Sequence, residues 1–563
     1  MSRYSGVPAG AFGRTVEQDA CLPDDAVGPS GVVPARSASA LSRSPAPSTT
    51  DRPTRRRTAA SEAEKSTLWV LGDQLHRTSG VLRNADPSRH RILFVTSLRS
   101  IRSKGWHRQR LHIVLAGMAK LAAQLRDEGF DVDERVSATL LCGWEEHCVE
   151  FAPTATALMH PNSWSGAERV KGRGVELLPN DQFLCTPTEF ATWAATRTKQ
   201  IRMEDFYRWQ RQRLGILIEP DGTPAGGSWN YDDQNRERPP KDGRTWPEPE
   251  RFELDEIDRR VASFIDSHAP HAFGAPYDGL WPTTTAQAEA RLDRVIAGVL
   301  PMFGPHEDAM LHGNWHLAHT LLSSALNLGM LNPATVIERA VDAYRRGAVP
   351  LSSAEGFIRQ IIGWREYVWG LYWLWMPDYA AQNALGAVRP IPPAFVGAPT
   401  NMRCVSRCVE DLESRGYLHH IQRLMVLGNL SLLAGVDPKA LTDWMWAGFV
   451  DAAEWVMVPN VIGMSQHADG GRMATKPYAS GGAYISKMSD YCTGCSYDPK
   501  KRVGSNACPF TTLYWDFLAR HDERFRRNHR MSKPLAGMRR LSDLEAVRER
   551  AASVLHALDE GTL

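Results

Sequence analysis

The N-terminal half of the chain alternates short apolar runs with a longer amphipathic stretch. Short apolar runs bounded by polar or turn residues are typical of buried strands. Four such runs occur, at residues 67–75, 91–96, 156–159 and 175–178. Residues 106–128 instead repeat their apolar positions at helical spacing and are followed by Gly129, which predicts a helix. Strands that alternate with helices predict an α/β fold, with a doubly wound parallel sheet over about residues 66–185.

The rest of the chain divides by composition. Residues 1–65 are rich in Ser, Pro, Arg and Ala without an apolar period, so they predict a disordered tail. Residues 219–250 are dense in Gly, Pro, Asp and Arg, as expected of a linker or a long interdomain loop. From about residue 281 onward the pattern is almost wholly helical. We therefore predict an α/β domain over residues 66–190, an interdomain segment over 191–280 and an all-α domain over 281–558.

The composition is that of a folded protein in a reducing compartment. The chain has 563 residues, of which 43% are hydrophobic and 23% are charged, so two or three domains are expected. The apolar runs are shorter than a bilayer span, so we expect a soluble protein with no membrane partner. Nine cysteines scattered over so long a chain do not resemble a secreted disulfide scaffold, which favours the cytoplasm. The net charge is only +2, so binding to DNA would need a local basic patch.

Three cysteines in the C-terminal part have the spacing of metal ligands. Cys492 and Cys495 form a C-x-x-C motif, and Cys508 follows, just before a proline. Thiolates at this spacing suit Zn²⁺ or an iron–sulfur cluster. A fourth ligand is needed, and Cys404 and Cys408 are the nearest candidates upstream. Spacing alone leaves three interpretations open: an iron–sulfur cluster, a structural zinc site, or buried free thiols.

A charged and aromatic stretch over residues 355–367 is the most informative helix. Its apolar positions recur at helical spacing, yet two arginines and two glutamates stand among them, including Glu355, Arg359 and Arg365. A solvated helix face does not need aromatic residues beside its charges, whereas a buried set of charge pairs around a polar ligand does. The spacing also permits a helix packed between domains with ordinary ion pairs.

Two adjacent histidines, His419 and His420, stand at the start of another apolar helix. Neighbouring side chains on a helix diverge by about 100°, so the two rings cannot face one ligand equally. One imidazole can then meet a reacting group while the other supports it, and imidazole titrates close to neutrality. A lone core histidine is usually only packed, but a pair in Trp-rich surroundings favours proton transfer.

Polar residues elsewhere in the helical half offer contacts for a nucleotide-like cofactor. Asp451, Glu454 and Asn460 lie in apolar surroundings and have the groups needed to hydrogen-bond a flavin. Thr320 and Ser323 place hydroxyls near a helix start, where a pyrophosphate is favourable.

Together these motifs resemble the cryptochrome/photolyase superfamily, and most closely its iron–sulfur bacterial members, the prokaryotic (6-4) photolyases. The resemblance runs from Thr67 to Leu558. It rests jointly on four segments and the cysteine set, none of which is sufficient alone. The segments are residues 72–75, 355–360, 419–423 and 459–465.

The resemblance implies an N-terminal α/β antenna domain and a C-terminal helical domain that holds FAD and a [4Fe-4S] cluster. The implied cluster ligands are Cys404, Cys492, Cys495 and Cys508, which leaves Cys408 outside the set. The FAD contacts that we expect are Thr320, Ser323, Glu355, Arg359, Trp364, Arg365, Asp451, Glu454, Asn460 and Trp444.

The activity implied by the resemblance is light-dependent repair of (6-4) pyrimidine photoproducts in UV-damaged DNA by a monomeric DNA lyase. Excited reduced FAD would donate an electron to the lesion, which must first flip out of the base stack. His420 matches the family's proposed proton donor, and His419, Tyr478 and Tyr484 match residues that line the lesion pocket. Two alternatives are a blue-light photoreceptor of the same fold without repair, and an iron–sulfur nucleic-acid-binding module without photochemistry.

The sequence departs from the family pattern in its electron chain and at its antenna site. Trp444 keeps the flavin-proximal position of the chain of aromatic residues, but Met445 and Val396 occupy the next two positions. Ser100 and Ser103 stand where the family grips a lumazine antenna, so the antenna chromophore is uncertain. These changes predict that light collection and electron transfer to the flavin differ from the family pattern.

Overall fold

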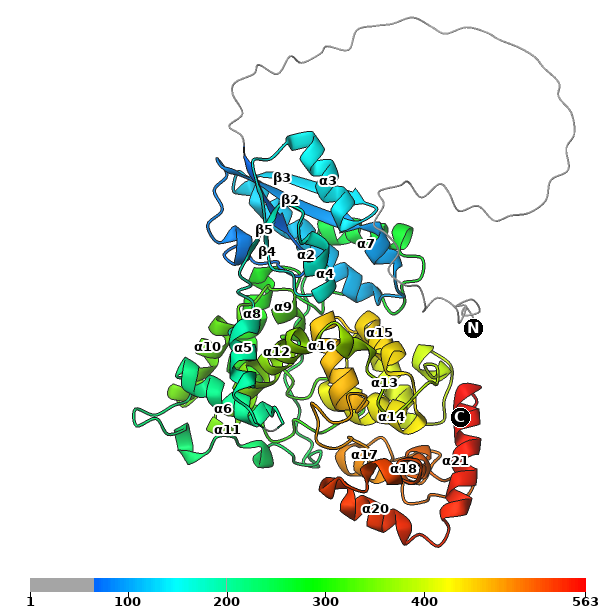
Figure 1. Cartoon of the computed structure of the whole chain (residues 1–563). Helices are drawn as coiled ribbons and strands as arrows, with labels where there is room; N and C mark the ends of the chain where they lie inside the picture. The colour runs from blue at the N-terminus through cyan, green and yellow to red at the C-terminus, as the bar shows by residue number, and fades with distance from the viewer. Residues whose placement is uncertain (1–64, 199) are drawn as a thin grey trace, which may run out of the picture.

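A five-stranded parallel sheet forms the N-terminal part of the computed structural model, which describes residues 65–198 and 200–563 (Figure 1). The spatial order of the strands is β3-β2-β1-β4-β5, and all neighbouring pairs are parallel. The strands are β1 (Ser66–Val70), β2 (His90–Ser97), β3 (Asp131–Ser137), β4 (Thr156–Met159) and β5 (Val175–Leu178). The parallel sheet predicted from the apolar runs is therefore confirmed. The predicted disordered tail lies outside the described residues, apart from Lys65.

Side chains alternate along the strands and so divide the apolar residues between the two faces of the sheet. Leu68 and Val70 pack on the face covered by α2 (Arg108–Asp127), whereas Trp69 packs with residues of α3 (Leu140–Phe151) on the other face. Helices on both faces make the sheet doubly wound. The helix predicted over residues 106–128 corresponds to α2. Three shorter helices complete this part of the chain: α1 (Leu98–Arg102), α4 (Trp164–Val170) and α5 (Pro187–Ala195).

Strand β3 is not predicted by the apolar pattern. Its sequence is mostly charged, and only Ser137 at its end is buried. It lies at the edge of the sheet and pairs with β2 from Arg91 opposite Asp131 to Ser97 opposite Ser137. An edge strand has a neighbour on one side only and tolerates charged side chains, so backbone pairing rather than apolar burial holds it.

Two helices occupy the interval between residues 191 and 280, and they pack against different neighbours. α6 (Met203–Leu214) lies against a helical segment at Arg359–Arg365, and α7 (Glu256–His268) lies against α2. The carboxylate of Asp258 on α7 accepts a hydrogen bond from Nζ of Lys120 at 2.7 Å, which ties α7 to α2. Residues 219–250, between the two helices, form loops with short 3-10 turns.

The described chain from residue 281 onward is helical, as predicted (Figure 1). Across residues 65–198 and 200–563, no helix combines the length and the apolar character needed to cross a membrane. The helices are α8 (Thr285–Arg294), α9 (Ser323–Asn327), α10 (Pro333–Arg345), α11 (Leu351–Ile358), α12 (Glu366–Trp375), α13 (Arg403–Arg415), α14 (Asn429–Ala434), α15 (Pro438–Gly448), α16 (Glu454–Val458), α17 (Gly482–Met488), α18 (Pro509–Arg520), α19 (Asp522–Phe525), α20 (Ser532–Arg539) and α21 (Leu544–Asp559).

π-helical segments overlap three of the sequence motifs. The segments are η6 (Arg359–Arg365), η9 (Gln422–Gly428) and η10 (Pro459–Ser465). A π-helical turn contains an extra residue and is frequently found at functional sites. A fourth π-helical segment, η4 (Val295–Val299), lies outside the motifs, so this winding coincides with three motifs without being confined to them.

A buried ion pair joins the segment after β5 to the helical part of the molecule. Nη1 of Arg365 lies 3.3 Å from Oε1 of Glu366, and the two side chains are 9% and 0% exposed. Oε2 of Glu366 accepts hydrogen bonds from the backbone N–H groups of Leu184 at 2.9 Å and Cys185 at 2.8 Å. Arg365 donates to the carbonyl oxygen of Gln182 at 2.9 Å. Burial raises the pKa of Glu366 to about 7, although Arg365 and the two N–H groups oppose that rise.

Glu366→Ala is expected to lower the free energy of unfolding by about 3–5 kcal/mol, because it leaves Arg365 buried without its partner. Urea unfolding followed by tryptophan fluorescence measures this loss. The matched control is Glu410→Ala, which removes the half-exposed partner of Arg407 and should cost about 0–1 kcal/mol. Equal losses in the two variants would show that the buried pair does not hold the two parts together.

Candidate functional site

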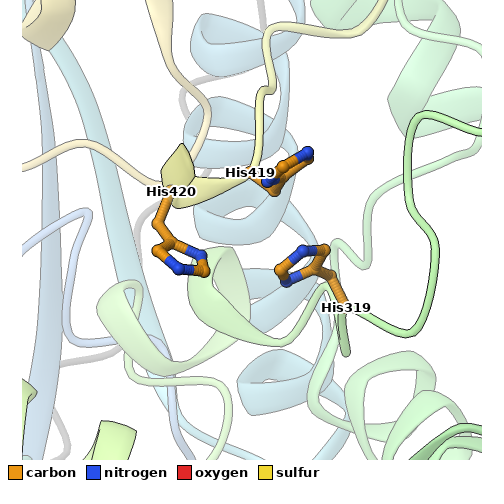
Figure 2. Close-up of side chains that lie close together, drawn as sticks. All are labelled: His319, His419 and His420. Carbon is orange, nitrogen blue, oxygen red and sulfur yellow. The ribbon is translucent and has the colours of Figure 1, made fainter. Parts of the chain in front are cut away.

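Three histidines from two segments of the helical part meet at one place (Figure 2). His319 lies in the loop before α9, and His419 and His420 lie just before η9. The rings of His319 and His419 stack, with centroids 4.5 Å apart and planes 15° from parallel. His420 meets His319 edge-on, with the centroids 5.5 Å apart. The structure thus adds a third imidazole to the predicted pair.

The chain turns sharply just before the histidine pair. Helix α13 ends at Arg415 and is capped by Gly416, whose φ of 63° lies in the left-handed region that favours glycine. A Cβ atom at this position would lie only 2.9 Å from Cγ1 of Val450 and 3.0 Å from Nδ1 of His107. After the turn, the backbone N–H of His419 donates to Oε1 of Gln422 at 3.1 Å. The left-handed turn and this hydrogen bond fix where the two histidines leave the backbone.

The two adjacent histidines have opposite environments. His419 is 2% exposed, and its burial, together with the charges of the neighbouring imidazoles, holds its pKa well below the usual value. The side chain of His420 is 49% exposed, and its Nε2 lies 3.3 Å from Oδ1 of Asp308. The surrounding protein opposes a charge on His420, but the hydrogen bond with Asp308 and the charges of Glu307 and Asp308 outweigh this and raise its pKa. The buried ring is therefore neutral, and the exposed ring holds a proton more readily.

Asp308 also acts on the two tyrosines predicted to line the pocket. Burial is the main cause of the raised pKa of both Tyr478 and Tyr484, and the negative charge of Asp308 adds to it in each case. The positive charge of Arg236 acts on both tyrosines in the opposite direction. Three of the four residues predicted for catalysis, His420, Tyr478 and Tyr484, therefore lie within electrostatic range of Asp308.

A hydrogen-bonded network links the histidine pair to two of the predicted cofactor residues. Ser323 donates its hydroxyl to Oδ2 of Asp451 at 2.7 Å. Arg423 donates to both carboxylate oxygens of Asp451, at 2.9 and 3.1 Å, and its Nε donates to the carbonyl oxygen of Leu418 at 2.6 Å. The guanidinium also lies 3.9 Å from the ring centroid of Phe449. This network connects the start of α9 to the turn that carries His419 and His420.

Glu355 and Arg359 form a second, separate buried pair. The carboxylate of Glu355 accepts hydrogen bonds from the hydroxyl of Tyr207 at 2.8 Å and from the backbone N–H of Tyr231 at 3.0 Å. Nη2 of Arg359 donates to Oδ1 of Asp232 at 2.9 Å, and its Nε lies 3.5 Å from Oε1 of Glu355. Burial raises the pKa of Glu355. The pair therefore holds α6 and the following loop against η6.

Two further predicted cofactor residues, Glu454 and Asn460, form hydrogen bonds with other residues of the protein. Oε2 of Glu454 accepts a hydrogen bond from the hydroxyl of Ser165 at 3.4 Å, so it meets the sheet-containing part of the chain. Nδ2 of Asn460 donates to the carbonyl oxygen of Val456, one turn earlier, at 2.8 Å. Arg365, as described above, lies at the same junction as Glu454.

The remaining predicted cofactor residues are two tryptophans and a threonine. Trp444 on α15 packs against Phe395, with ring centroids 5.1 Å apart. Trp364 meets Tyr367 edge-on at 6.2 Å. Thr320 follows His319 directly in the chain. Among the predicted cofactor residues, Thr320 and the Ser323–Asp451 pair thus lie on the side of the histidines. Arg365 and Glu454 instead lie at the junction with the sheet.

The loop that carries His319 and Thr320 has an unusual backbone conformation. Leu317 and Leu321 have φ values of 46° and 55°, and non-glycine residues in this region are uncommon and gather at ligand sites. The hydroxyl of Ser324, at the start of α9, is buried without a hydrogen-bond partner in the described part of the chain. An unpaired buried polar group is unfavourable, so this segment fits a polar ligand.

Four cysteines line one small cavity in the C-terminal part. They are Cys404, Cys492, Cys495 and Cys508, while Cys408 does not contribute to the lining. Burial and the proximity of the other thiols raise the pKa of Cys404 far above its usual value, because several thiolates cannot coexist there without a cation. Gly482 makes the cavity possible, since a Cβ atom there would lie 2.7 Å from Sγ of Cys508. An all-sulfur donor set of this kind fits an iron–sulfur cluster or zinc.

Sequence reasoning did not assign a role to Asp308, His319 or Asp232. Asp308 and His319 lie in the irregular segment before α9, and Asp232 lies in the loop after α6, so helical periodicity gives no signal for any of them. The sequence predicts a role for the neighbouring Thr320 through its hydroxyl. For His319 the one indication in the sequence is its place beside Thr320, before an apolar helix.

Comparisons with known proteins agree with this architecture. A family model described as "deoxyribodipyrimidine photo-lyase-related protein" matches residues 68–281. The crystal structure of a bacterial class III photolyase from Agrobacterium tumefaciens aligns with a TM-score of 0.53 at 16% identity, covering 89% of this chain and 100% of that one. The fold is that of a photolyase.

Sequence identity assigns the chain to a family more specifically than the fold does. A protein of Agrobacterium fabrum named "(6-4) photolyase" is 39% identical over 506 residues, which cover 87% of this chain and 99% of that protein. The chain therefore belongs to the (6-4) photolyase family. This confirms the resemblance drawn from the motifs.

Cys508→Ala is expected to lower the metal content of the purified protein, because it deletes one of the four sulfur donors of the cysteine cavity. Metal analysis of the purified protein measures the loss. Cys408→Ala is the matched control, because it empties a similar buried position outside the cavity and should keep the metal. Equal metal content in the two variants would exclude Cys508 as a ligand.

Proposed function

We propose that this protein repairs (6-4) pyrimidine photoproducts in DNA in a light-dependent reaction. The observation that carries the proposal is the half-exposed His420, which lies against Asp308, the acidic residue whose charge also acts on Tyr478 and Tyr484. The extensive identity to a protein named (6-4) photolyase supports the same lesion.

FAD is the cofactor that the residues of the site fit. Ser323 and Asp451 would offer hydrogen bonds beside the histidines, and the strained loop at Leu317–Leu321 with the unpaired hydroxyl of Ser324 would receive its pyrophosphate. Asn460 and Trp444 would lie against the flavin ring. Bound FAD, when reduced and excited by light, would supply the electron that opens the lesion.

The protein's own residues would then orient the lesion and move a proton. The damaged bases must leave the stack to reach the site, and extruding a weakened base pair costs less than extruding a normal one. His420 can hold a proton against Asp308 and present it to the hydroxyl that moves between the two bases. His419, buried and stacked on His319, would keep His420 in position.

A [4Fe-4S] cluster is the group that we propose for the cysteine cavity. Cys404, Cys492, Cys495 and Cys508 would each bind one iron atom through sulfur. Cys404 lies in α13, Cys492 and Cys495 lie in the loop after α17, and Cys508 directly precedes α18. The cluster would therefore tie these segments together and contribute to the stability of this part of the fold.

We infer that light and electrons reach the site by routes that differ from the family pattern. Ser103 donates its hydroxyl to the carbonyl oxygen of Ser100 at 2.8 Å, so it completes the end of α1. Met445 is buried and Val396 is 61% exposed, and neither side chain is an efficient relay for an electron. This proposal therefore assigns no antenna chromophore.

His420→Ala is expected to lower the repair rate by about 10²–10⁴-fold, the usual contribution of a general acid, while the flavin stays bound. The measurement is the loss of (6-4) lesion from an oligonucleotide under near-ultraviolet light, resolved by chromatography. His312→Ala, an exposed histidine of the same irregular segment as Asp308, is the matched control and should repair at the normal rate. Repair by His420→Ala at the normal rate would refute the proton-donor role, and failure of the unaltered, flavin-loaded protein to repair would refute the proposed function.

A further inference from the structure

The three histidines of Figure 2 offer converging nitrogen donors. One nitrogen from each ring lies within 4.8 Å of the other two. Zn–N bonds are about 2.0–2.1 Å long, so nitrogens bound to one tetrahedral ion lie roughly 3.3 Å apart. Because the rings of His319 and His419 stack and an imidazole lone pair lies in the ring plane, one of these two rings must turn about its Cβ–Cγ bond to bind the same ion. The half-exposed His420 has room to follow that movement.

Two of these rings hold a buried nitrogen that the protein leaves unpaired. Nε2 of His319 and Nδ1 of His419 have no hydrogen-bond partner within residues 65–198 and 200–563. His419 is only 2% exposed, so water does not readily take the place of a partner. A buried polar atom without a partner destabilises the fold, and a metal ion that accepts its lone pair would remove that penalty.

The outer sides of two rings are held as they are in metal sites. Asp308 lies against Nε2 of His420, and the backbone of Glu307 hydrogen-bonds the ring of His319. A metal-bound histidine usually donates its second ring N–H to a carboxylate or a carbonyl, which fixes the orientation of the ring. The nearby cation, Arg423, is already paired with Asp451 and would repel an added positive charge less than a free guanidinium.

We propose that His319, His419 and His420 bind one divalent transition-metal ion of the Zn²⁺ class. Imidazole donors suit zinc, copper and nickel, whereas magnesium and calcium prefer oxygen ligands. A bound ion would occupy His420 and would keep it from delivering a proton. The metal would therefore inhibit repair, and this consequence, unlike the binding itself, rests on the proposed function.

The binding test uses the full-length protein with its native chromophores, ZnCl₂ as the probe, and neither DNA nor light. Isothermal titration should show one site, and zinc-edge X-ray absorption should show nitrogen ligands at about 2.0 Å, with sulfur at about 2.3 Å absent. His319→Gln and His419→Gln should each raise the Kd for zinc by roughly 10-fold or more. His312→Gln, outside the cluster, should leave it unchanged.

Two results would overturn the proposal. One is a zinc affinity that is the same in His319→Gln, His419→Gln and the unaltered protein. The other is an X-ray absorption spectrum with sulfur ligands alone, which would place the ion among the cysteines. Circular dichroism checks that each variant folds, and if one does not, the spectrum of the unaltered protein decides.

The consequence for repair is tested separately. Zinc at one equivalent should slow lesion loss, and an excess of EDTA should restore it. Zinc that binds through the histidines without slowing repair would refute the inhibition while leaving the site intact. If the unaltered protein repairs no lesion in the absence of zinc, the proposed function fails, and the binding result still stands on its own.

Discussion

The buried ion pair between Arg365 and Glu366 is the constraint on which the arrangement of the molecule depends. Two charges removed from water are stable only while they face each other and the polar groups around them. Glu366 meets two backbone N–H groups that follow β5, so the sheet is held to the helices at a fixed place. Earlier in the same continuous helix, Glu355 and Arg359 bind α6 and the loop after it. One helix thereby positions the sheet and one wall of the helical part together.

The elements that the sequence predicts well are those whose side chains are buried on a regular period. The strands β1, β2 and β4 and the helix α2 carry buried apolar residues at strand or helix spacing. β5 is predicted by its apolar run as well, although its side chains are only partly buried or exposed. β3 lacks that signal because it lies at the edge, where Asp131 and its charged neighbours meet solvent and only the backbone is paired. Its presence follows from the whole sheet and not from its own residues.

The candidate site divides in the same way. His419 and His420 stand together in the chain, and Cys492 and Cys495 are spaced as ligands, so both groups can be found by reading along the sequence. Asp308 and His319 come from an irregular segment about a hundred residues earlier, and only the folded chain brings them to the pair. Charged residues of one motif also serve different purposes, since Arg359 binds Asp232 in the loop after α6 while Arg365 holds the junction with the sheet.

The π-helical winding of η6, η9 and η10 has a consequence for how such a chain can change over evolutionary time. Each segment contains a residue more than an α-helix of the same length would hold, and loss of that residue would let it relax to ordinary α-helix. All side chains beyond the deletion would then rotate by about 100° relative to those before it. Insertions and deletions within these segments should therefore be purged from descendant lineages far more strictly than substitutions. The number of residues in each motif would then be conserved as strictly as their identity.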